Sequence, residues 1–584
     1  MYIFDEYDEY YRYPQGAVTD SETLKMRVLL SRGAYTGPRL RVQRDGGPDY
    51  TLPAEYAGAR GSYGVYNMSF TPPEPGLYWY WFEADSDAGT VAIYNGPDQK
   101  PFQLTVYDAD YKTPEWIKGG VMYQLFVDRF ARLSETPPYV RETGRYRPDW
   151  DGTPDFRADE NGVVRNDDFF GGSLDGVIEK LPYLSELGVT CIYLSPIFDA
   201  ASNHKYDVGD YLKIDPAFGD EQTFVRLCKE AGELGMRVIC DGVFNHVGVD
   251  SRYFNRFGRY DSLGAYQSQD SPYYDWFTFR NWNTDYDAWW NVKLLPSLNK
   301  NSESLKEFLM GDSGVLGYWS ERGCGGWRLD VADELPDSFL GPLCASVKDK
   351  DPNALILGEV WEDASNKISY AVRRRYLLGG QLDSVTNYPL KDALIAYALG
   401  GGAAALADTM AALVQNYPKP ALDCLMNIVG THDTMRILTV LGAENLPDGK
   451  EAMSVFRLSE RERRTAAEKL KIVSALQFTL PGFPCVFYGD EAGMEGGADP
   501  FCRGCYPWGN EDLELLDWYK NLARIRRSLP ALHGGAYHLL WADGGIFAFQ
   551  RGEADDAITI TANISNLDVT IYNTRGIILG NKTE

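Results

Sequence analysis

The feature that most limits the fold is an alternation of short apolar runs with amphipathic helical runs between about Gly119 and Pro530. Such alternation is typical of a parallel β-sheet whose strands are joined by crossover helices. Eight units in succession favour a closed (β/α)8 TIM barrel, an α/β fold. A doubly wound open sheet is the alternative, but no GxGxxG sequence follows an early strand. The eight predicted strands are 121–126, 189–195, 237–244, 326–331, 354–361, 382–388, 422–430 and 483–489.

Two β-rich regions flank the predicted barrel, and one long connection interrupts it. Short β segments with Gly/Pro turns predict an N-terminal β-sandwich, and four more predict a C-terminal antiparallel β domain. The connection after the third strand is rich in aromatic residues, Asn and Asp and has little periodicity, so we expect an inserted subdomain. The expected division is 1–112 for the sandwich, 113–530 for the barrel, about 247–303 for the insertion and 531–584 for the last domain.

The charge balance excludes several classes of partner. The chain has 57 basic and 83 acidic residues, a formal net charge of −26. Nucleic-acid binding needs basic patches, and an anionic membrane surface repels an acidic protein. No apolar run approaches the length of a bilayer span, and the first residues lack the features of a signal peptide. We therefore expect no nucleic-acid partner and no membrane partner.

The cysteines predict the compartment. There are nine, an odd number, and several lie inside predicted strands. Buried free thiols in a reducing compartment fit this distribution, so we expect a cytoplasmic protein. The Cys-Arg-Gly-Cys sequence at 502–505 has no second pair at metal-binding spacing and does not predict zinc.

Polar residues gather where the predicted strands end. In a TIM barrel the catalytic groups lie at the C-terminal ends of the strands, so these residues are the candidates for chemistry. The third strand is followed by Asp241, Asn245 and His246, the fourth by Arg328 and Asp330, the fifth by Glu359, and the seventh by His432 and Asp433.

The order and spelling of these runs resemble the α-amylase family of glycoside hydrolases. DGVFNH, GWRLDVADE, GEVW and VGTHD resemble four conserved blocks of that family, and LPSLN and GFPCVFYGDE resemble two more. VADE, LPSLN and the NYP after the sixth strand point to its cyclomaltodextrinase, neopullulanase and maltogenic amylase subgroup. The resemblance covers about residues 115–530. It implies retaining hydrolysis of α-1,4 glucosidic bonds in maltooligosaccharides, cyclodextrins, pullulan or starch. Cleavage of α-1,6 bonds as well stays open.

The resemblance also implies the catalytic roles. Asp330 matches the nucleophile, Glu359 the acid/base and Asp433 the third acid, which grips sugar hydroxyls. Retaining cleavage passes through an oxocarbenium-like transition state and needs two carboxyl groups roughly 5 Å apart, one to attack and one to donate a proton. Arg328 lies two residues before Asp330, so both side chains share a face of the strand, and its charge would keep Asp330 ionised.

Further residues match substrate-binding positions of the family. These are His204, Tyr206, His246, Glu334, Trp361, His432, Asp499 and Arg503. A packed loop tyrosine is the alternative for Tyr206, and a loop-anchoring salt bridge for Asp499 with Arg503. We expect Asp241 and Asn245 to support the site without touching sugar. Two roles remain open for Trp276, Trp282, Trp289 and Trp290. Each could stack against a sugar on the acceptor side of the cleaved bond, or pack the core of the insertion.

A calcium site after the first strand is common in this family. Here that stretch reads DRFARLSETPPYV and lacks the expected Asn and Asp, and ADENGVVRNDD downstream supplies oxygen ligands at no recognised spacing. We therefore expect no cofactor to be required and leave calcium open. The subgroup further suggests a homodimer through the N-terminal domain.

Two other functions remain open. A transglycosylase would use the same covalent intermediate with a sugar in place of water as acceptor. A non-catalytic sugar-binding relative would have lost the acids, and this chain retains all three.

Overall fold

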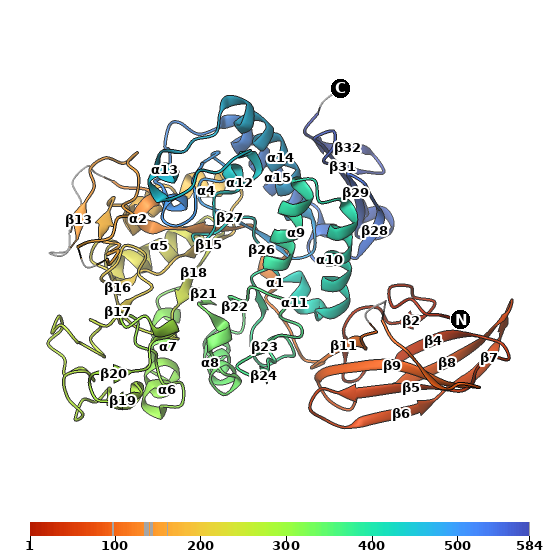
Figure 1. Cartoon of the computed structure of the whole chain (residues 1–584). Coiled ribbons are helices and arrows are strands. Elements are labelled where there is room, and N and C mark those ends of the chain that lie inside the picture. Colours follow the sequence, from red (N-terminus) through yellow and green to blue (C-terminus); the bar gives the residue numbers. More distant parts are fainter. Residues whose placement is uncertain (96–98, 134–138, 140–143, 161, 583–584) are drawn as a thin grey trace. The chain divides into compact units, whose positions relative to one another are not determined.

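The computed structural model describes residues 1–584 except 96–98, 134–138, 140–143, 161 and 583–584 (Figure 1). The chain forms two compact units. The first contains Met1–Thr113, Asp363–Asp383 and Asp408–Leu422, and the second contains Pro114–Glu362, Ser384–Ala407 and Asp423–Glu584. Two segments that we assigned to the barrel thus belong to the first unit.

The first unit is the expected β-sandwich. One sheet contains β1 (Tyr2–Ile3), β2 (Arg12–Tyr13), β4 (Leu24–Ser31), β7 (Glu55–Arg60) and β8 (Tyr63–Phe70). The other contains β3 (Val18–Thr19), β5 (Thr36–Arg44), β6 (Asp49–Pro53), β9 (Gly76–Ser86), β10 (Gly89–Ile93) and β11 (Phe102–Tyr107). Alternate residues of β4 point inward, and Leu24, Met26 and Val28 are buried in a shared core with Tyr80 and Leu104.

The two later segments of this unit are tied to the sandwich by buried hydrogen bonds. The hydroxyl of Tyr111 donates to the backbone oxygens of Leu382 and Asp383 at 2.9 and 2.8 Å. The backbone N–H of Gly16 donates to Oε1 of Gln415 at 3.1 Å. These segments include β23 (Ile368–Ser369), β24 (Val372–Arg373) and most of α11 (Lys419–Asp423).

The second unit is built on an eight-stranded parallel barrel, which confirms the predicted fold. Its strands are β12 (Met122–Leu125), β15 (Cys191–Leu194), β18 (Arg237–Gly242), β21 (Cys324–Leu329), β22 (Leu355–Gly358), β25 (Ser384–Val385), β26 (Met426–Asn427) and β27 (Phe483–Phe487). The sheet order is β25-β22-β21-β18-β15-β12-β27-β26, and a parallel bridge from Thr386 to Met426 closes it. Each predicted apolar run therefore overlaps one barrel strand, and β21 begins two residues before the run predicted for it.

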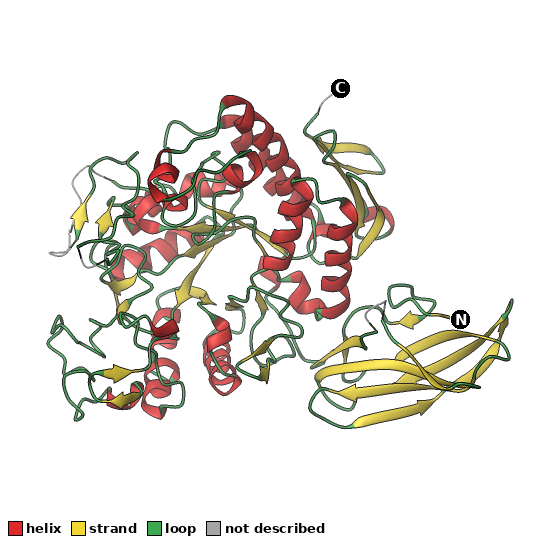
Figure 2. Cartoon of the chain, viewed as in Figure 1, coloured by secondary structure: helices red, strands yellow, loops and turns green. Residues whose placement is uncertain are grey.

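Helices surround these strands (Figure 2). They are α1 (Glu115–Lys118), α2 (Val127–Phe130), α3 (Leu174–Glu179), α4 (Leu181–Leu187), α5 (Glu221–Glu233), α6 (Glu303–Met310), α7 (Val315–Ser320), α8 (Asp337–Lys350), α9 (Tyr388–Ala398), α12 (Ile437–Gly442), α13 (Lys450–Val455), α14 (Glu460–Thr479) and α15 (Leu513–Ser528). The helix α10 (Ala403–Asn416) begins in this unit, and its residues from Asp408 onward belong to the first. Asp220 caps α5 by accepting from the N–H of Thr223. No helix in the described part of the chain has both the length and the apolar character that crossing a bilayer requires.

The insertion and the C-terminal domain take the expected places in the chain. The insertion runs from β18 to α6 and contains two short strands, β19 (Phe279–Asn281) and β20 (Asp285–Tyr286), with two 3-10 turns, η1 (Tyr274–Trp276) and η2 (Trp289–Asn291). The C-terminal strands β28 (Tyr537–Asp543), β29 (Ile546–Arg551), β30 (Ile558–Asn563), β31 (Asp568–Asn573) and β32 (Gly576–Gly580) form an antiparallel meander. All nine cysteines are free thiols, and seven of them are buried.

Candidate active site

A cavity of about 660 Å³ lies among the loops that follow the barrel strands. Of the residues predicted for the site, Arg328 alone does not line it. The predicted residues on its wall are His204, Tyr206, His246, Asp330, Glu334, Glu359, Trp361, His432, Asp433, Asp499 and Arg503. Residues from loops far apart in sequence thus meet in one cavity, as strand ends of a barrel do.

Arg328 joins three carboxylates beside this cavity. Its Nη1 donates to Oδ1 of Asp330 and of Asp241, both at 3.0 Å, and its Nη2 lies 2.9 Å from Oε1 of Glu359. All four side chains are buried. One guanidinium therefore holds Asp330, at the end of β21, beside Glu359, at the end of β22.

The backbone directly after Asp330 is strained. Val331, a β-branched residue, adopts a left-handed conformation with φ +39° and ψ +57°, which costs about 1–3 kcal/mol. In that conformation its N–H donates to Oε2 of Glu359 at 2.9 Å. The indole N–H of Trp361 donates to the other oxygen, Oε1, at 3.2 Å. Both oxygens of Glu359 are thus held in place.

Crowding of carboxylates changes the protonation of the site. Burial raises the pKa of Asp330 well above its ordinary value, and although Arg328 opposes this, the charges of Glu359, Asp241 and Asp433 add to it. The charges of these three acids therefore oppose ionisation of Asp330, and the charge of Arg328 favours it. The ionised state that we expected for Asp330 stays a prediction.

Asp433 is held by a basic side chain from the loop after β27. Nη2 of Arg503 donates to its Oδ1 at 3.2 Å, and Nη1 of Arg503 pairs with Asp499 at 2.8 Å. Nε2 of His432 lies 3.2 Å from Oδ2 of Asp433. Asp499 and Arg503 therefore form the salt bridge that was the alternative to sugar binding, and both also line the cavity.

Three histidines around the cavity are neutral. Burial lowers the pKa of His204. Burial, assisted by the charge of Lys300, lowers the pKa of His246 to about 3. Burial, followed by the charges of Arg503 and Arg328, lowers the pKa of His432 well below its ordinary value. Each imidazole therefore has one N–H donor and one acceptor nitrogen, and it carries no charge.

Tyr206 forms a flat wall of the cavity. Its ring stacks on His432 with centroids 5.1 Å apart and an angle of 8°. Its hydroxyl donates to Oδ2 of Asp241 at 2.9 Å, and the hydroxyl of Tyr193 donates to the same oxygen at 2.6 Å. Asp241 is absent from the cavity lining, so its contacts are those of a supporting residue.

The tryptophans left open by the sequence separate into two groups. Trp276 is buried against Tyr253 and Phe308, and the N–H of Trp282 donates to the backbone oxygen of Ala265 at 3.0 Å, so these two pack the insertion. Trp289 and Trp290 line the cavity with Trp361. Trp290 is 78% exposed and Trp361 is 48% exposed, which is unusual for so large an apolar side chain unless a ligand covers it.

Sequence reasoning missed part of the lining. Asn166, Leu295, Val331, Asp333 and Glu362 also contribute to the cavity wall. Asp333 and Glu362 each lie three residues after a predicted catalytic acid, and that spacing is the signal that could have found them. Asn166 comes from an irregular loop before the second strand, where no pattern marks it.

The carboxylates near the proposed calcium region already have partners. Asp128 accepts from Nε of Arg129 at 2.7 Å and from the backbone N–H of Phe170 at 3.0 Å. Asp168 lies 3.7 Å from Arg129 and accepts from Asn203 at 2.8 Å. Among the described residues no group of three or more His, Cys, Asp or Glu is arranged to hold a metal, and residues 134–138, 140 and 161 of the stretches considered lie outside that description. The described side chains do not fit a calcium ion here.

A parallel barrel with two buried acids joined by one guanidinium, on a cavity lined by histidines and exposed indoles, has the pair of acids that glycosidases use. The chain belongs to the α-amylase family, because the model of the α-amylase catalytic domain matches residues 124–527. It is 35% identical to a cyclomaltodextrinase of Geobacillus thermopakistaniensis over 94% of this chain and 89% of that protein.

Two further similarities agree with this assignment. The chain is 35% identical to an amylopullulanase of Thermoanaerobacterium saccharolyticum over 98% of its own length, but it spans only 49% of that protein. The structure of a type III pullulan hydrolase from Thermococcus kodakarensis superposes with a TM-score of 0.67 and 28% identity, covering 97% of this chain and 94% of the other.

Proposed function

We propose that this protein hydrolyses α-1,4 and α-1,6 glucosidic bonds of α-glucans with retention of configuration. Asp330 attacks the anomeric carbon, Glu359 donates its proton to the leaving oxygen and then activates water, and Asp433 binds hydroxyls of the distorted sugar. The single observation that carries this proposal is the guanidinium of Arg328, which holds Asp330 and Glu359 together on the wall of one cavity.

A hydrolysis panel tests the proposal. Cyclodextrin, pullulan, starch and short maltooligosaccharides are incubated with the protein, and the products are sized and their anomeric configuration is followed by NMR. We expect smaller maltooligosaccharides with the α configuration from at least one substrate. Products of inverted configuration, or no cleavage of any of the four, would contradict the proposal.

We propose that no metal is needed for this activity. The support is that Asp128 and Asp168 are satisfied by arginine, amide and backbone donors. Dialysis against EDTA is expected to leave both the rate and the melting temperature unchanged, and a restoration of either by calcium would refute it.

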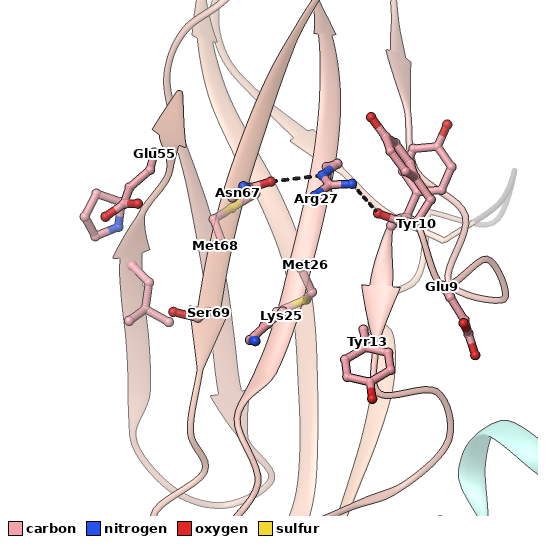
Figure 3. A pocket seen from close by; sticks show the side chains of 13 residues that line it. Glu9, Tyr10, Tyr13, Lys25, Met26, Arg27, Glu55, Asn67, Met68 and Ser69 are labelled. Carbon is pink, nitrogen blue, oxygen red and sulfur yellow. Dashed lines mark hydrogen bonds between the residues drawn. The ribbon is translucent and has the colours of Figure 1, made fainter. Parts of the chain in front are cut away.

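We propose a homodimer formed through the N-terminal unit, in a reducing compartment such as the cytoplasm. A cleft of about 480 Å³ lies in this unit. Figure 3 shows Tyr10 and Tyr13 on one side of it and Glu55 on the other. Exposed aromatic rings beside a cleft are typical of surfaces that bind a partner, and the nine free thiols fit reducing conditions. Sedimentation equilibrium of the wild type and of Tyr13→Ser tests the dimer, and a monomeric wild type would exclude it.

A further inference from the structure

A lysine at the end of the insertion is connected to the active site through an asparagine. Lys300 directly follows the LPSLN sequence, and its Nζ donates to the backbone oxygen of Asn245 at 3.0 Å and to its Oδ1 at 2.5 Å. Burial lowers the pKa of Lys300 to about 8, against the opposing charges of Glu334 and Asp287. At neutral pH the amine is therefore mostly protonated.

The ammonium group determines which way the amide of Asn245 points. A protonated lysine can only donate hydrogen bonds, so the side-chain atom of Asn245 that faces it must be the oxygen. The Nδ2 of Asn245 must then face the other way, where Nδ1 of His246 lies 3.2 Å from it. An amide that is otherwise ambiguous in orientation is thus fixed by charge.

The orientation of Asn245 in turn selects the tautomer of His246. Because Nδ2 can only donate, Nδ1 of the neutral imidazole must accept, and the ring proton must sit on Nε2. Nε2 is buried and receives no hydrogen bond of ordinary geometry among the described residues, although the backbone oxygen of Tyr206 interacts with the ring, and His246 lines the sugar cavity. A buried donor without a well-placed acceptor is unfavourable, and a ligand oxygen would supply that acceptor.

We propose that Lys300 is a positioning residue which, through Asn245, holds His246 as the tautomer that donates from Nε2 to a hydroxyl oxygen of the bound glucan. The inference rests on the proposed function for its substrate. Stacking of the His246 ring on Trp289, with centroids 5.1 Å apart and an angle of 16°, fixes the ring plane, so Lys300 needs to determine only where the proton sits.

The tautomer is measured directly, without substrate. The chain has five histidines, so ¹⁵N-histidine labelling and the variant His246→Gln identify the signals of His246. We expect the wild type to show a protonated Nε2 and an unprotonated Nδ1, and Lys300→Arg to retain this pattern. Lys300→Met should give a mixture of both tautomers. A wild-type signal with the proton on Nδ1 would overturn the proposal, whatever the protein proves to hydrolyse.

A double-mutant cycle measures the consequence for hydrolysis. We expect Lys300→Met to lower kcat/KM on maltooligosaccharides about tenfold and His246→Ala to lower it further. In the double variant the lysine substitution should have no additional effect, because it acts through His246. The matched control is Lys293→Met, another lysine of the insertion that does not line the cavity, with the rate of the wild type expected. Independent, multiplicative effects of the two substitutions would mean that Lys300 has only a structural role.

A second variant keeps the proposal testable if Lys300→Met does not fold. In Asn245→Asp the carboxylate still accepts from Lys300, but it cannot donate to Nδ1 of His246. The proton should therefore move to Nδ1, and kcat/KM should fall at least about tenfold while the melting temperature is retained. Full activity of a folded Asn245→Asp protein would overturn the proposal. If the wild type itself hydrolyses no α-glucan, the proposed function fails, and the NMR experiment still decides the tautomer.

Discussion

At the scale of single residues, the site depends on one buried cation that serves several acids. Arg328 contacts Asp241, Asp330 and Glu359, and a guanidinium suits this because its donors diverge in one plane. The cation keeps the acids close together, while burial and the neighbouring acids raise the pKa of Asp330. Stability is given up at this point for chemistry, as is common at catalytic sites.

The first prediction concerns the nucleophile. We expect Asp330→Asn to lower kcat at least about 10⁴-fold, because an amide cannot form the glycosyl-enzyme intermediate. Maltooligosaccharide should still bind with an affinity within a few-fold of wild type, measured by isothermal titration calorimetry. Activity near the wild-type level would mean that another group attacks the sugar.

The same variant makes a prediction about stability and pH. The pKa of Asp330 is raised in the folded state, so its neutral form stabilises the fold at low pH and this contribution is lost as pH rises through the raised value. Asp330→Asn stays neutral, and its melting temperature should therefore exceed that of the wild type by a margin that grows as the pH rises. Calorimetric scans at an acidic and a basic pH measure this, and a variant that melts below the wild type at the basic pH would contradict the prediction.

A separate prediction concerns the most exposed tryptophan of the insertion, Trp290. Trp290 lines the cavity while 78% exposed and has a left-handed backbone with φ +47°. We expect Trp290→Ala to raise KM about tenfold for long maltooligosaccharides, with little change in kcat and less than about 0.5 kcal/mol in stability. Phe257→Ala is the control, since Phe257 is 65% exposed in the same insertion and does not line the cavity. Equal KM values for both variants would exclude Trp290 from sugar binding.

At the scale of elements, two neighbouring barrel strands end where their catalytic acids begin. β21 ends at Leu329 and β22 at Gly358, and the next residue of each is a catalytic acid. These strands are neighbours in register, with Leu329 opposite Gly358, so the two acids leave the sheet side by side. The spacing of the acids therefore follows from strand pairing and not from the loops.

A buried acid between the first two strands of the N-terminal unit should make the stability of the protein depend on pH. Glu6, between β1 and β2, accepts from Asn95 at 2.9 Å, and burial raises its pKa to about 7. The stability it contributes as a neutral group is full below pH 4.5 and is lost as pH rises through 7. Glu6→Gln should therefore be more stable than wild type at pH 8, by about 3 kcal/mol at most, with a smaller difference at pH 5. Urea denaturation at the two pH values measures this, and parallel pH profiles would refute it.

At the scale of the whole molecule, the N-terminal unit is assembled from three separate parts of the chain. Asp45 pairs with Arg373 at 2.9 Å, and Gly16 donates to Gln415. Bonds of this kind join residues more than 300 positions apart. The unit is therefore not a module that ends where the barrel begins.

Truncation tests this assembly. Removing residues 1–113 would leave the segments 363–383 and 408–422 without the buried partners that they have in this unit. We expect the truncated chain to aggregate or to melt well below the full chain in a thermal scan, because buried polar groups lose their hydrogen bonds. A soluble, active truncated protein with an unchanged melting temperature would show that those segments are stable alone.

Much of this arrangement could be predicted because it depends on local patterns. The apolar runs around Met122 and Cys485 alternate with helices, and strands so arranged close into a barrel whatever the loops contain. The link from Lys300 to Asn245 could not be predicted, because 55 residues of irregular chain separate them and no periodicity describes their path. Asn166 was missed for the same reason.

The sequence by itself determined the eight strands, the order of the polar clusters that follow them and the family of the chain, because hydrophobic periodicity and short motifs are local properties. Only the tertiary structure decided which indoles face the cavity, that Arg328 joins Asp330 to Glu359, and that residues 363–383 and 408–422 belong with the N-terminal strands. Burial, charge proximity and long-range hydrogen bonds arise between distant parts of a chain, and they exist only once the chain is packed.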